Sequence, residues 1–282
     1  MSDKLYVASI GDCCVDIYPQ KNKFFPGGSA FNVALQVHKT GAEASIISAV
    51  GTDAFAELFH TVCKTYKINA EHLSVIQGTT SNLKVQIDDR GKPSYTEWDL
   101  GVLRDYLPDD KCELFLEKQR AIRFVLFRPL AHIFDRFCQM RLSNTLKIAD
   151  FAGITMYSEG IETIKRYIHN FDIFVKSLDE SDTDALQFFE KIAYEEDKIV
   201  LVLLGAKGSI VFSKGKMYQQ QAFTTTEVRD TTGAGDAYNA SFIVTYLQTR
   251  NIEDAMYQGT LAATRTISHF GANPACVVEP LQ

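Results

Sequence analysis

One short stretch of the chain combines flexible glycines with carboxylates at a spacing that suits phosphoryl transfer. It is the segment Asp230-Thr231-Thr232-Gly233-Ala234-Gly235-Asp236. Glycines let successive backbone amides turn toward one anion. The apolar-periodic run after them, 237–246, predicts a helix whose N-terminus would face the same anion. Asp236 would then lie beside an anion hole, where a carboxylate can accept the proton of a hydroxyl that attacks phosphorus. A glycine-rich turn capped by Asp236 is the alternative, and the acidic residues on both sides favour the catalytic interpretation.

A second group of residues, nearer the N-terminus, suits a substrate with many hydroxyl groups. Asp12 ends an apolar run, Asp16 follows on an extended piece, and Asn32 opens a helix pattern. Carboxylates and amides can form paired hydrogen bonds with vicinal hydroxyls. Gly27 and Gly28 would let backbone amides come close to the same ligand. The three polar side chains could therefore converge on one sugar. For Asp12, the sequence leaves a loop cap open as an equal alternative.

Two further segments carry weaker signals for a nucleotide and its metal. The turn with Leu204, Gly205 and Gly208 could pack against a nucleotide, although a plain β-turn between strands has the same pattern. Ser177 and Glu180 follow an apolar run, and a carboxylate there could orient Mg²⁺ through water. A helix N-cap with acidic residues in its first turn is an equal alternative for this second segment.

The elements that must position these residues alternate between short apolar runs and amphipathic segments. The runs predict buried strands at 5–11, 44–50, 122–127, 146–150, 173–176, 199–204, 209–212 and 216–220. The amphipathic segments predict helices at 29–41, 54–64, 133–142, 160–169, 184–194, 237–248 and 253–269. This order favours an α/β fold with a doubly wound, mostly parallel sheet flanked by helices. Ligands in such folds bind at the carboxyl edge of the strands.

The pattern changes between Thr79 and Gly101. Residues 81–87 and 93–98 alternate between polar and apolar types on either side of the turn 88–91, which predicts a β-hairpin. A half-exposed hairpin inserted into an α/β pattern suggests a lid over an active site. Together with 15–25 it could form a small separate sheet. We therefore expect one domain, 1–282, with a lid subdomain from about 13–25 and 79–101.

The composition of the chain limits the classes of binding partner and the cellular compartment that we expect. The chain has 282 residues, a net charge of -6 and no long basic run, so nucleic acid and anionic membrane surfaces are unfavourable partners. Its apolar runs are too short to span a bilayer, and its first residues lack a signal-peptide pattern. The six cysteines are scattered without a Cys-x-x-Cys spacing. They favour a cytoplasmic protein with reduced thiols.

At this point the motifs resemble those of a known family. The segment 230–236 resembles the C-terminal signature of the PfkB (ribokinase-like) sugar kinases, and Gly27-Gly28-Ser29-Ala30-Phe31-Asn32-Val33-Ala34 resembles their N-terminal signature. Spacing and strand order agree along essentially the whole chain. Segments 11–28 and 258–271 are similar to those of members that phosphorylate Amadori compounds such as fructoselysine. The resemblance implies a ribokinase-like fold with a small β-sheet lid, ATP-dependent transfer to a primary hydroxyl, Mg²⁺ as cofactor, and the lid-to-lid homodimers common in the family.

The resemblance also implies roles for single residues. Asp236 would be the catalytic base, and the anion hole would consist of Gly233, Ala234 and Gly235. The sugar would be held by Asp16, Gly28 and Asn32, and the nucleotide would lie along Gly205 and Gly208. A monovalent cation such as K⁺ would bind backbone oxygens at Asp230 and Thr232.

Two positions depart from the family pattern. The family usually has Asn-x-x-Glu near the metal and phosphates, whereas Ser177 stands here in place of the Asn and Glu180 is kept. The nucleotide loop often has Thr before Leu-Gly, whereas this chain has Leu203. Neither change touches the base, so we expect an active kinase. A fructokinase or ribokinase-type kinase, a nucleoside kinase and a catalytically silent sugar-binding protein are the alternatives.

Overall fold

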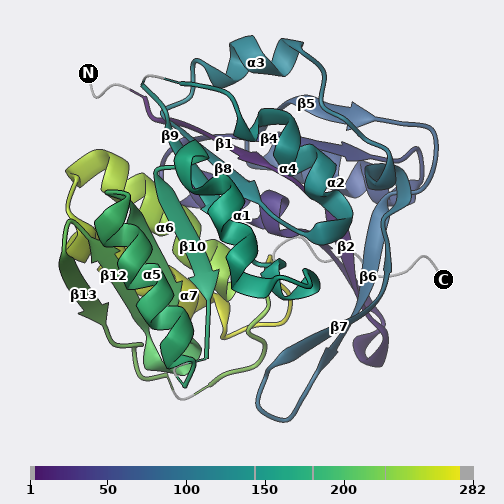
Figure 1. Cartoon of the computed structure of the whole chain (residues 1–282). Helices are drawn as coiled ribbons and strands as arrows, with labels where there is room; N and C mark the ends of the chain where they lie inside the picture. The colour runs from purple at the N-terminus through teal and green to yellow at the C-terminus, as the bar shows by residue number, and fades with distance from the viewer. Residues whose placement is uncertain (1–3, 143, 180, 226, 274–282) are drawn as a thin grey trace.

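The fold is an open α/β sheet with helices on both faces (Figure 1). A computed structural model describes residues 4–273 except 143, 180 and 226. Its large sheet has nine strands in the order β13-β12-β11-β10-β9-β8-β1-β4-β5, parallel except for the antiparallel pairs of β12 with β11 and β13. The strands are β1 (Tyr6–Ile10), β4 (Glu43–Val50), β5 (Asn69–Val75), β8 (Ala121–Val125), β9 (Leu146–Asp150), β10 (Ile173–Ser177), β11 (Ile199–Leu203), β12 (Ser209–Ser213) and β13 (Lys216–Gln220). The prediction of a mostly parallel, doubly wound sheet is confirmed.

Helices cover both faces of this sheet and bury one hydrophobic core on each. One face carries α1 (Ser29–Lys39), α2 (Ala54–Thr65), α6 (Ala234–Thr249) and α7 (Ile252–Thr266). The other carries α3 (Lys111–Leu116), α4 (Ala131–Cys138) and α5 (Thr183–Glu195). Along β1, Val7 packs into the first core and Ala8 into the second. Strands buried on both faces explain why the sequence shows continuous apolar runs instead of alternation.

A second, smaller sheet stands beside the first and contains the predicted hairpin. Its strands are β2 (Cys14–Tyr18), β3 (Lys23–Gly27), β6 (Ser81–Ile87) and β7 (Pro93–Asp99), in the order β3-β2-β6-β7. Figure 1 shows the β6–β7 hairpin extending below the body of the molecule. The hairpin tip reaches the segment 230–236, where the Thr231 amide donates to the Gly91 carbonyl at 2.9 Å. This contact places the tip against the predicted anion hole.

Several elements differ from the sequence-based expectation. The strand β5 and the helix α3 were not predicted, and α6 begins at Ala234, three residues before the predicted start. The segment 160–170, predicted as a helix, is a 3₁₀ helix. The remaining 3₁₀ helices are Pro19–Lys21, Gly101–Arg104, Arg128–Leu130, Ile154–Met156 and Gly205–Lys207. None of the helices among the described residues is long and apolar enough to cross a membrane.

Candidate active site

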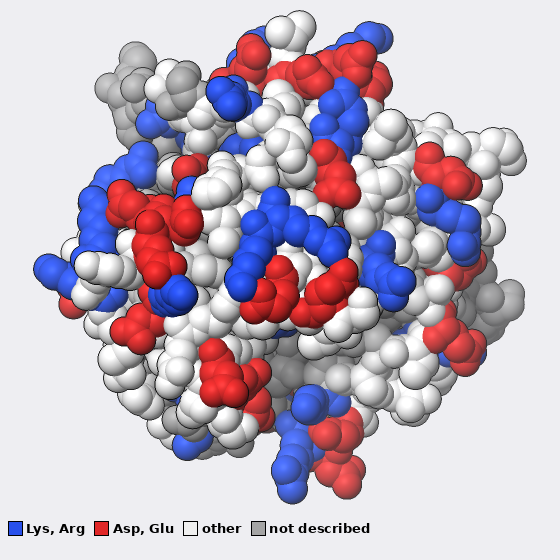
Figure 2. Space-filling model, in the orientation of Figure 1, with Lys and Arg blue, Asp and Glu red and all other residues white. Residues whose placement is uncertain are grey.

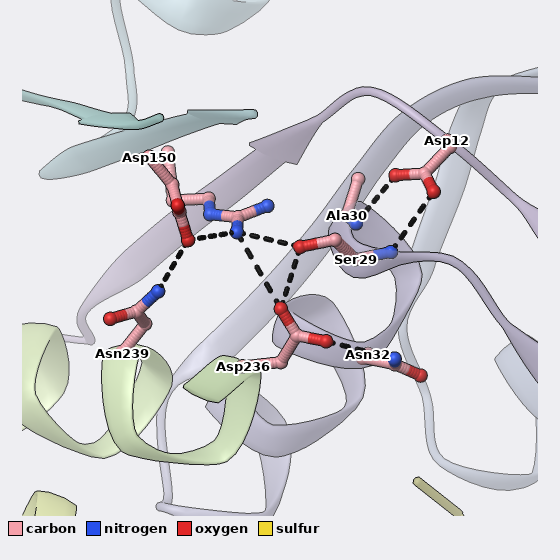
Figure 3. Close-up of polar contacts among 8 residues, drawn as sticks. Asp12, Ser29, Ala30, Asn32, Asp150, Asp236 and Asn239 are labelled. Atoms are coloured by element: carbon pink, nitrogen blue, oxygen red, sulfur yellow. Dashed lines mark hydrogen bonds and ion pairs between the residues drawn. The ribbon is translucent and has the colours of Figure 1, made fainter. Parts of the chain in front are cut away.

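Asp236 lies where a helix from the early part of the chain and one from its late part pack together. It belongs to the first turn of α6, and α6 packs against α1, which begins about 200 residues earlier. One oxygen of its carboxylate, Oδ1, accepts a hydrogen bond from the Ser29 hydroxyl at 2.6 Å. The other, Oδ2, accepts one from the Asn32 amide at 2.9 Å (Figure 3). The structure therefore brings the residue predicted as base together with a residue predicted to hold the sugar.

The start of α6 supplies backbone amides beside this carboxylate. Gly233 is the N-cap in a left-handed conformation with φ of 76°. A Cβ at this position would lie 2.4 Å from the Cβ of Ala272, so both conformation and space require glycine. The amide of Ala234 donates to the Thr231 carbonyl at 3.2 Å and so closes the turn. The next amides, of Gly235 and Asp236, are first-turn amides, which in an α-helix have no partner within the helix. Of the predicted anion hole, Ala234 thus shapes the turn, and Gly235 is placed to face an anion.

A buried network of charged and polar side chains lies next to Asp236. Arg123 comes from β8 and is fully buried. Its Nη2 donates to Asp150 on β9 and to the Ser29 hydroxyl, both at 2.7 Å, and lies 3.6 Å from Asp236 Oδ1. Asn239 of α6 donates to the same Asp150 oxygen at 2.7 Å. Sequence reasoning missed this network, although a charged residue inside the apolar run 122–127 was the available signal.

The environment of Asp236 adjusts its ionisation to near-neutral pH. Burial raises the pKa of Asp236 from 3.8 to about 6, against the opposing effects of the Arg123 charge and the hydrogen bonds from Ser29 and Asn32. A general base works best when its pKa lies near the working pH. At pH 7 the carboxylate is ionised and able to accept a proton.

The two acidic residues predicted near the sugar lie in different surroundings. Both oxygens of Asp12 accept amides at the start of α1, from Ser29 and Ala30 at 3.1 Å each. The sequence left a loop cap open for Asp12, and in the structure its carboxylate binds the first amides of α1. Asp16 is 4% exposed, and its carboxyl makes no hydrogen bond within the described residues. Burial raises its pKa well above the usual range, and the carboxylates of Asp12, Asp230 and Asp236 raise it further. A neutral carboxyl can both donate to and accept from a substrate hydroxyl.

The two glycines of the N-terminal motif are required by close packing around these carboxylates. A Cβ on Gly27 would lie 2.4 Å from Asp16 Oδ2. Gly28 has φ of +91°, and a Cβ there would lie 2.6 Å from the Asp12 carbonyl oxygen. Both positions therefore keep the carboxyl of Asp16 and the loop around Asp12 in place.

Asp230 and Thr232, the predicted cation residues, belong to a buried hydrogen-bond cluster. The Asp230 carboxylate accepts from the Tyr18 hydroxyl at 2.7 Å and from the amides of Thr232 and Gly271 at 2.8 Å each. Tyr18 is a lid residue, so the cluster ties the small sheet to the segment 230–236. A cation here would depend on backbone oxygens, because the Asp230 side chain is already engaged.

The residues predicted to meet the nucleotide lie along the same edge of the large sheet. Ser177 and Leu203 are register partners at the carboxyl ends of β10 and β11. Leu204 follows, and its amide donates to the Gly208 carbonyl at 2.8 Å, which closes the turn with Gly205. A Cβ on Gly235 would lie 3.6 Å from Leu203 Cδ1, so this turn is next to the start of α6. Glu180 lies outside the described residues.

Within the described residues, no preformed metal cage lies at Asp236. The single group of three or more His, Cys, Asp or Glu side chains close enough to share an ion there is His72, Asp109 and Cys112, at β5 and α3. Mg²⁺ commonly keeps several waters and binds substrate phosphates with one or two carboxylates. The site fits that mode of binding better than a protein-built cage.

The fold is that of the ribokinase-like proteins. An adenosine kinase from Sinorhizobium meliloti superposes with a TM-score of 0.81 at 21% identity, covering 99% of this chain and 97% of that one. A fructokinase from Vibrio cholerae, solved with fructose, ADP and calcium, superposes with a TM-score of 0.76 at 19% identity, covering 96% of each chain.

The family follows from the sequence. The model of the pfkB family carbohydrate kinases matches residues 4–103 and 141–279, and the chain belongs to this family. A fructoselysine 6-kinase from Shigella flexneri is 30% identical over 268 residues, which cover 94% of this chain and 98% of that protein. The chain is thus a carbohydrate kinase, a phosphotransferase that acts on sugars.

Proposed function

We propose that the chain transfers the γ-phosphoryl group of ATP to a primary hydroxyl of an Amadori compound, with fructoselysine as substrate and fructoselysine 6-phosphate as product. The observation that carries the reaction type is the Asp236 carboxylate, held by Ser29 and Asn32 beside the first-turn amides of α6. The Shigella flexneri relative supports the choice of substrate.

In this mechanism Asp236 accepts the proton of the attacking hydroxyl as its oxygen forms a bond to phosphorus. The bond from phosphorus to the leaving oxygen of ADP breaks in the same transfer. Asp16 and Asn32 orient the sugar, and the Gly235 and Asp236 amides face the charge that spreads over the transferred group. Positioning and electrostatics then provide most of the rate acceleration.

Bound together with the nucleotide, Mg²⁺ would supply positive charge that offsets the charge of the phosphate oxygens. We propose that Glu180 orients it through water and that the turn with Ser177, Gly205 and Gly208 lies along the nucleotide. K⁺ at the backbone oxygens of Asp230 and Thr232 belongs to the same proposal. The V. cholerae fructokinase, with ADP and calcium, supports a nucleotide–metal pair in a related fold.

The charges of the lid bear on the choice between fructoselysine and a plain sugar. Glu97 pairs with Lys84 across the hairpin, and Asp99 accepts the Gly101 amide. Arg90 and Lys92, near the tip, make no ion pair within the described residues. Their charges suit the carboxylate that a lysine-derived tail carries and free fructose lacks. We therefore assign the tail to the tip of the hairpin.

The test is ADP release by the purified protein with Mg-ATP, comparing fructoselysine, other fructosamines, fructose, ribose and adenosine. We expect the highest kcat/KM for fructoselysine. Exchange of Arg90 and Lys92 for Ala should raise KM for fructoselysine and leave the constants for fructose unchanged. Preference for free fructose or ribose would retain the reaction and refute the substrate. Silence with every sugar would refute the function.

We also propose a homodimer formed through the lid. Strand β7 is an edge of the small sheet, most of its residues are exposed, and Tyr95 is 54% exposed. An exposed edge strand is a template for pairing with a second chain. Light scattering coupled to gel filtration should give twice the 31.6 kDa of one chain. A monomer at micromolar concentration would refute this assembly and leave the kinase proposal intact.

A further inference from the structure

The guanidinium of Arg123 directs its hydrogen bonds almost entirely at the active site. All of its polar contacts within the described residues go through Nη2, to Asp150, Ser29 and Asp236. Its Nε and Nη1 are buried and have no hydrogen-bond partner there. Buried polar groups are nearly always hydrogen-bonded, and leaving donors of a buried charge unbonded costs stability. An arginine with only a structural role would be expected to form hydrogen bonds through all of its guanidinium nitrogens.

We propose that Arg123 is a positioning residue of the phosphoryl-transfer site, which keeps the Asp236 carboxylate ionised and fixes its orientation through Ser29. The inference rests on the proposed role of Asp236 as general base. Arg123 lies on β8 and acts on the carboxylate in two ways, through its Nη2, 3.6 Å from Asp236 Oδ1, and through the Ser29 hydroxyl.

The hydrogen-bond chemistry fixes the direction of this relay. A guanidinium has only donors, so the Ser29 oxygen must accept from Arg123 Nη2. The single hydroxyl hydrogen of Ser29 is then free to point at Asp236 Oδ1, at 2.6 Å. Arg123 thus holds Ser29 as a donor toward the ionised form of the base. A protonated Asp236 would lose part of this stabilisation.

The charges around Asp236 show why a cation is needed there. Asp150 on β9 raises the pKa of Asp236, whereas Arg123 on β8 lowers it with the larger effect. Asp12 and Asp16 on the small-sheet side and Asp230 before α6 add further carboxyl groups, and Asp16 and Asp236 disfavour each other's charge. From α1, Ser29 and Asn32 contribute uncharged donors. Within the described residues, Arg123 is the one cation in contact with Asp236. Without it, the protonated form of Asp236 would be more strongly favoured.

The test compares the ionisation of Asp236 in the wild type and in variants of the buried pair. Arg123→Met alone leaves Asp150 buried without its partner and risks misfolding. The double variant Arg123→Met/Asp150→Asn removes both charges together and keeps an acceptor for Asn239. Arg123→Lys restores a cation at the same place. Lys147→Met is the matched control, because Lys147 is a buried cation of β9 that bonds the carbonyls of Cys138 and Met140, away from this network.

Two readouts are measured on each protein after its melting curve has shown a folded state. The first is the titration of the Asp236 carboxyl carbon by NMR, assigned with Asp236→Asn, which needs no activity. The second is the pH dependence of kcat/KM. For the double variant we expect both midpoints to move upward, because the lost effect of Arg123 is larger than the opposing effect of Asp150. The shift should be smaller than the roughly one unit or more that loss of an arginine alone gives. Activity at pH 6.5 then falls more than activity at pH 9.

Each outcome decides the inference. The Arg123→Lys variant keeps a cation at this position, so the midpoint of its Asp236 titration should lie close to that of the wild type. The Lys147→Met variant should have the wild-type midpoint. If the double variant kept the wild-type midpoint and its kcat fell equally at all pH values, Arg123 would have only a structural role. That result would overturn the proposal. If the wild type released no ADP with any sugar, the proposed function would fail, and the NMR midpoint would still test the effect of Arg123 on Asp236.

Discussion

At the scale of single residues, Asp236 combines the placement and the surroundings of a general base. Its two oxygens are held by Ser29 and Asn32, and the start of α6 lies beside it. Asp236→Asn keeps the size of the side chain and removes its basicity. We expect a folded protein that binds sugar, with kcat lower by about a hundredfold to ten-thousandfold. The measurement is ADP release together with sugar-induced thermal stabilisation, and near-normal turnover would contradict the role of Asp236.

The pKa of Asp236 sets the acid limb of the pH profile. The pKa of this buried carboxyl is raised from 3.8 to about 6, and only its ionised form accepts a proton. Activity is therefore present above about pH 6 and lost below it. The value of kcat/KM should fall tenfold for each pH unit below that point, because the ionised fraction does. Initial rates in constant-ionic-strength buffers from pH 4.5 to 9 measure this limb, and a midpoint near pH 4 would mean an unperturbed carboxyl.

Sequence reasoning found the candidate site residues that lie in recognisable motifs. It missed residues whose role depends on neighbours that are distant in the sequence. Asp236, Asn32 and Asp16 were each selected from local patterns, and the structure brings all three to one site. Arg123 was missed because its meaning depends on Asp150, 27 residues away, and on Ser29, 94 residues away. Asp12 could not be decided from sequence, because a cap and a sugar ligand need the same residue at the same strand end.

At the scale of elements, periodicity predicted what is buried on a regular face. Strands β1, β4 and β8 to β13 were all expected, because burial on both faces demands continuous apolar residues. Strand β5 escaped because it is an edge strand, and only Leu73 among its residues is buried. The short helix α3 has six residues, too few to show a helical period. The pairing of β2 with β6 joins residues 67 positions apart, such as Cys14 and Ser81. The sequence suggested that 15–25 and the hairpin share a small sheet, but it gave no register for this pairing.

The hairpin tip offers a test of the lid as an element. Gly91 has φ of +76°, and a Cβ there would lie 3.0 Å from Val228 Cγ1 and 3.2 Å from the Arg229 carbonyl carbon. We expect Gly91→Ala to loosen the contact between the tip and Thr231. An opened lid admits water, so KM for sugar should rise and ATP hydrolysis without sugar should increase several-fold.

The matched control for this variant is Gly41→Ala. Gly41 also has a positive φ, +94°, but a Cβ there meets nothing within 4 Å. It shares the backbone strain and lacks the contact with the anion-hole segment. Coupled assays for ADP release with and without sugar separate the two variants. Equal effects on KM would show that strain, and not the lid contact, is responsible.

At the scale of the whole molecule, the site is assembled from distant parts of the chain. Asn32 accepts from Asn273 at 2.8 Å and donates to Asp236, so the first helix and the last described residue join beside Asp236. The small sheet adds Asp16, and its Tyr18 bonds Asp230. Positive and negative side chains are interspersed over the face shown in Figure 2, including the projecting lid hairpin. Among the described residues on that face, no extended patch of one sign is present.

A site built from segments far apart in the sequence exists only in the folded molecule, so a sugar that binds there should add to global stability. At 100 times its Kd, a ligand that binds only the folded state adds about 2.7 kcal/mol. Asp16→Asn should abolish most of that gain. It should also leave the free protein at least as stable at pH 7, because the raised pKa of Asp16 means that its ionised form opposes folding. The sign follows from linkage: the cost is absent below the ordinary value of 3.8 and grows as the pH rises toward the folded-state pKa. Urea unfolding with and without sugar measures both effects, with Asp105→Asn at an exposed position outside the lid as control. Full stabilisation by sugar in Asp16→Asn would remove Asp16 from the binding site and leave the base in place.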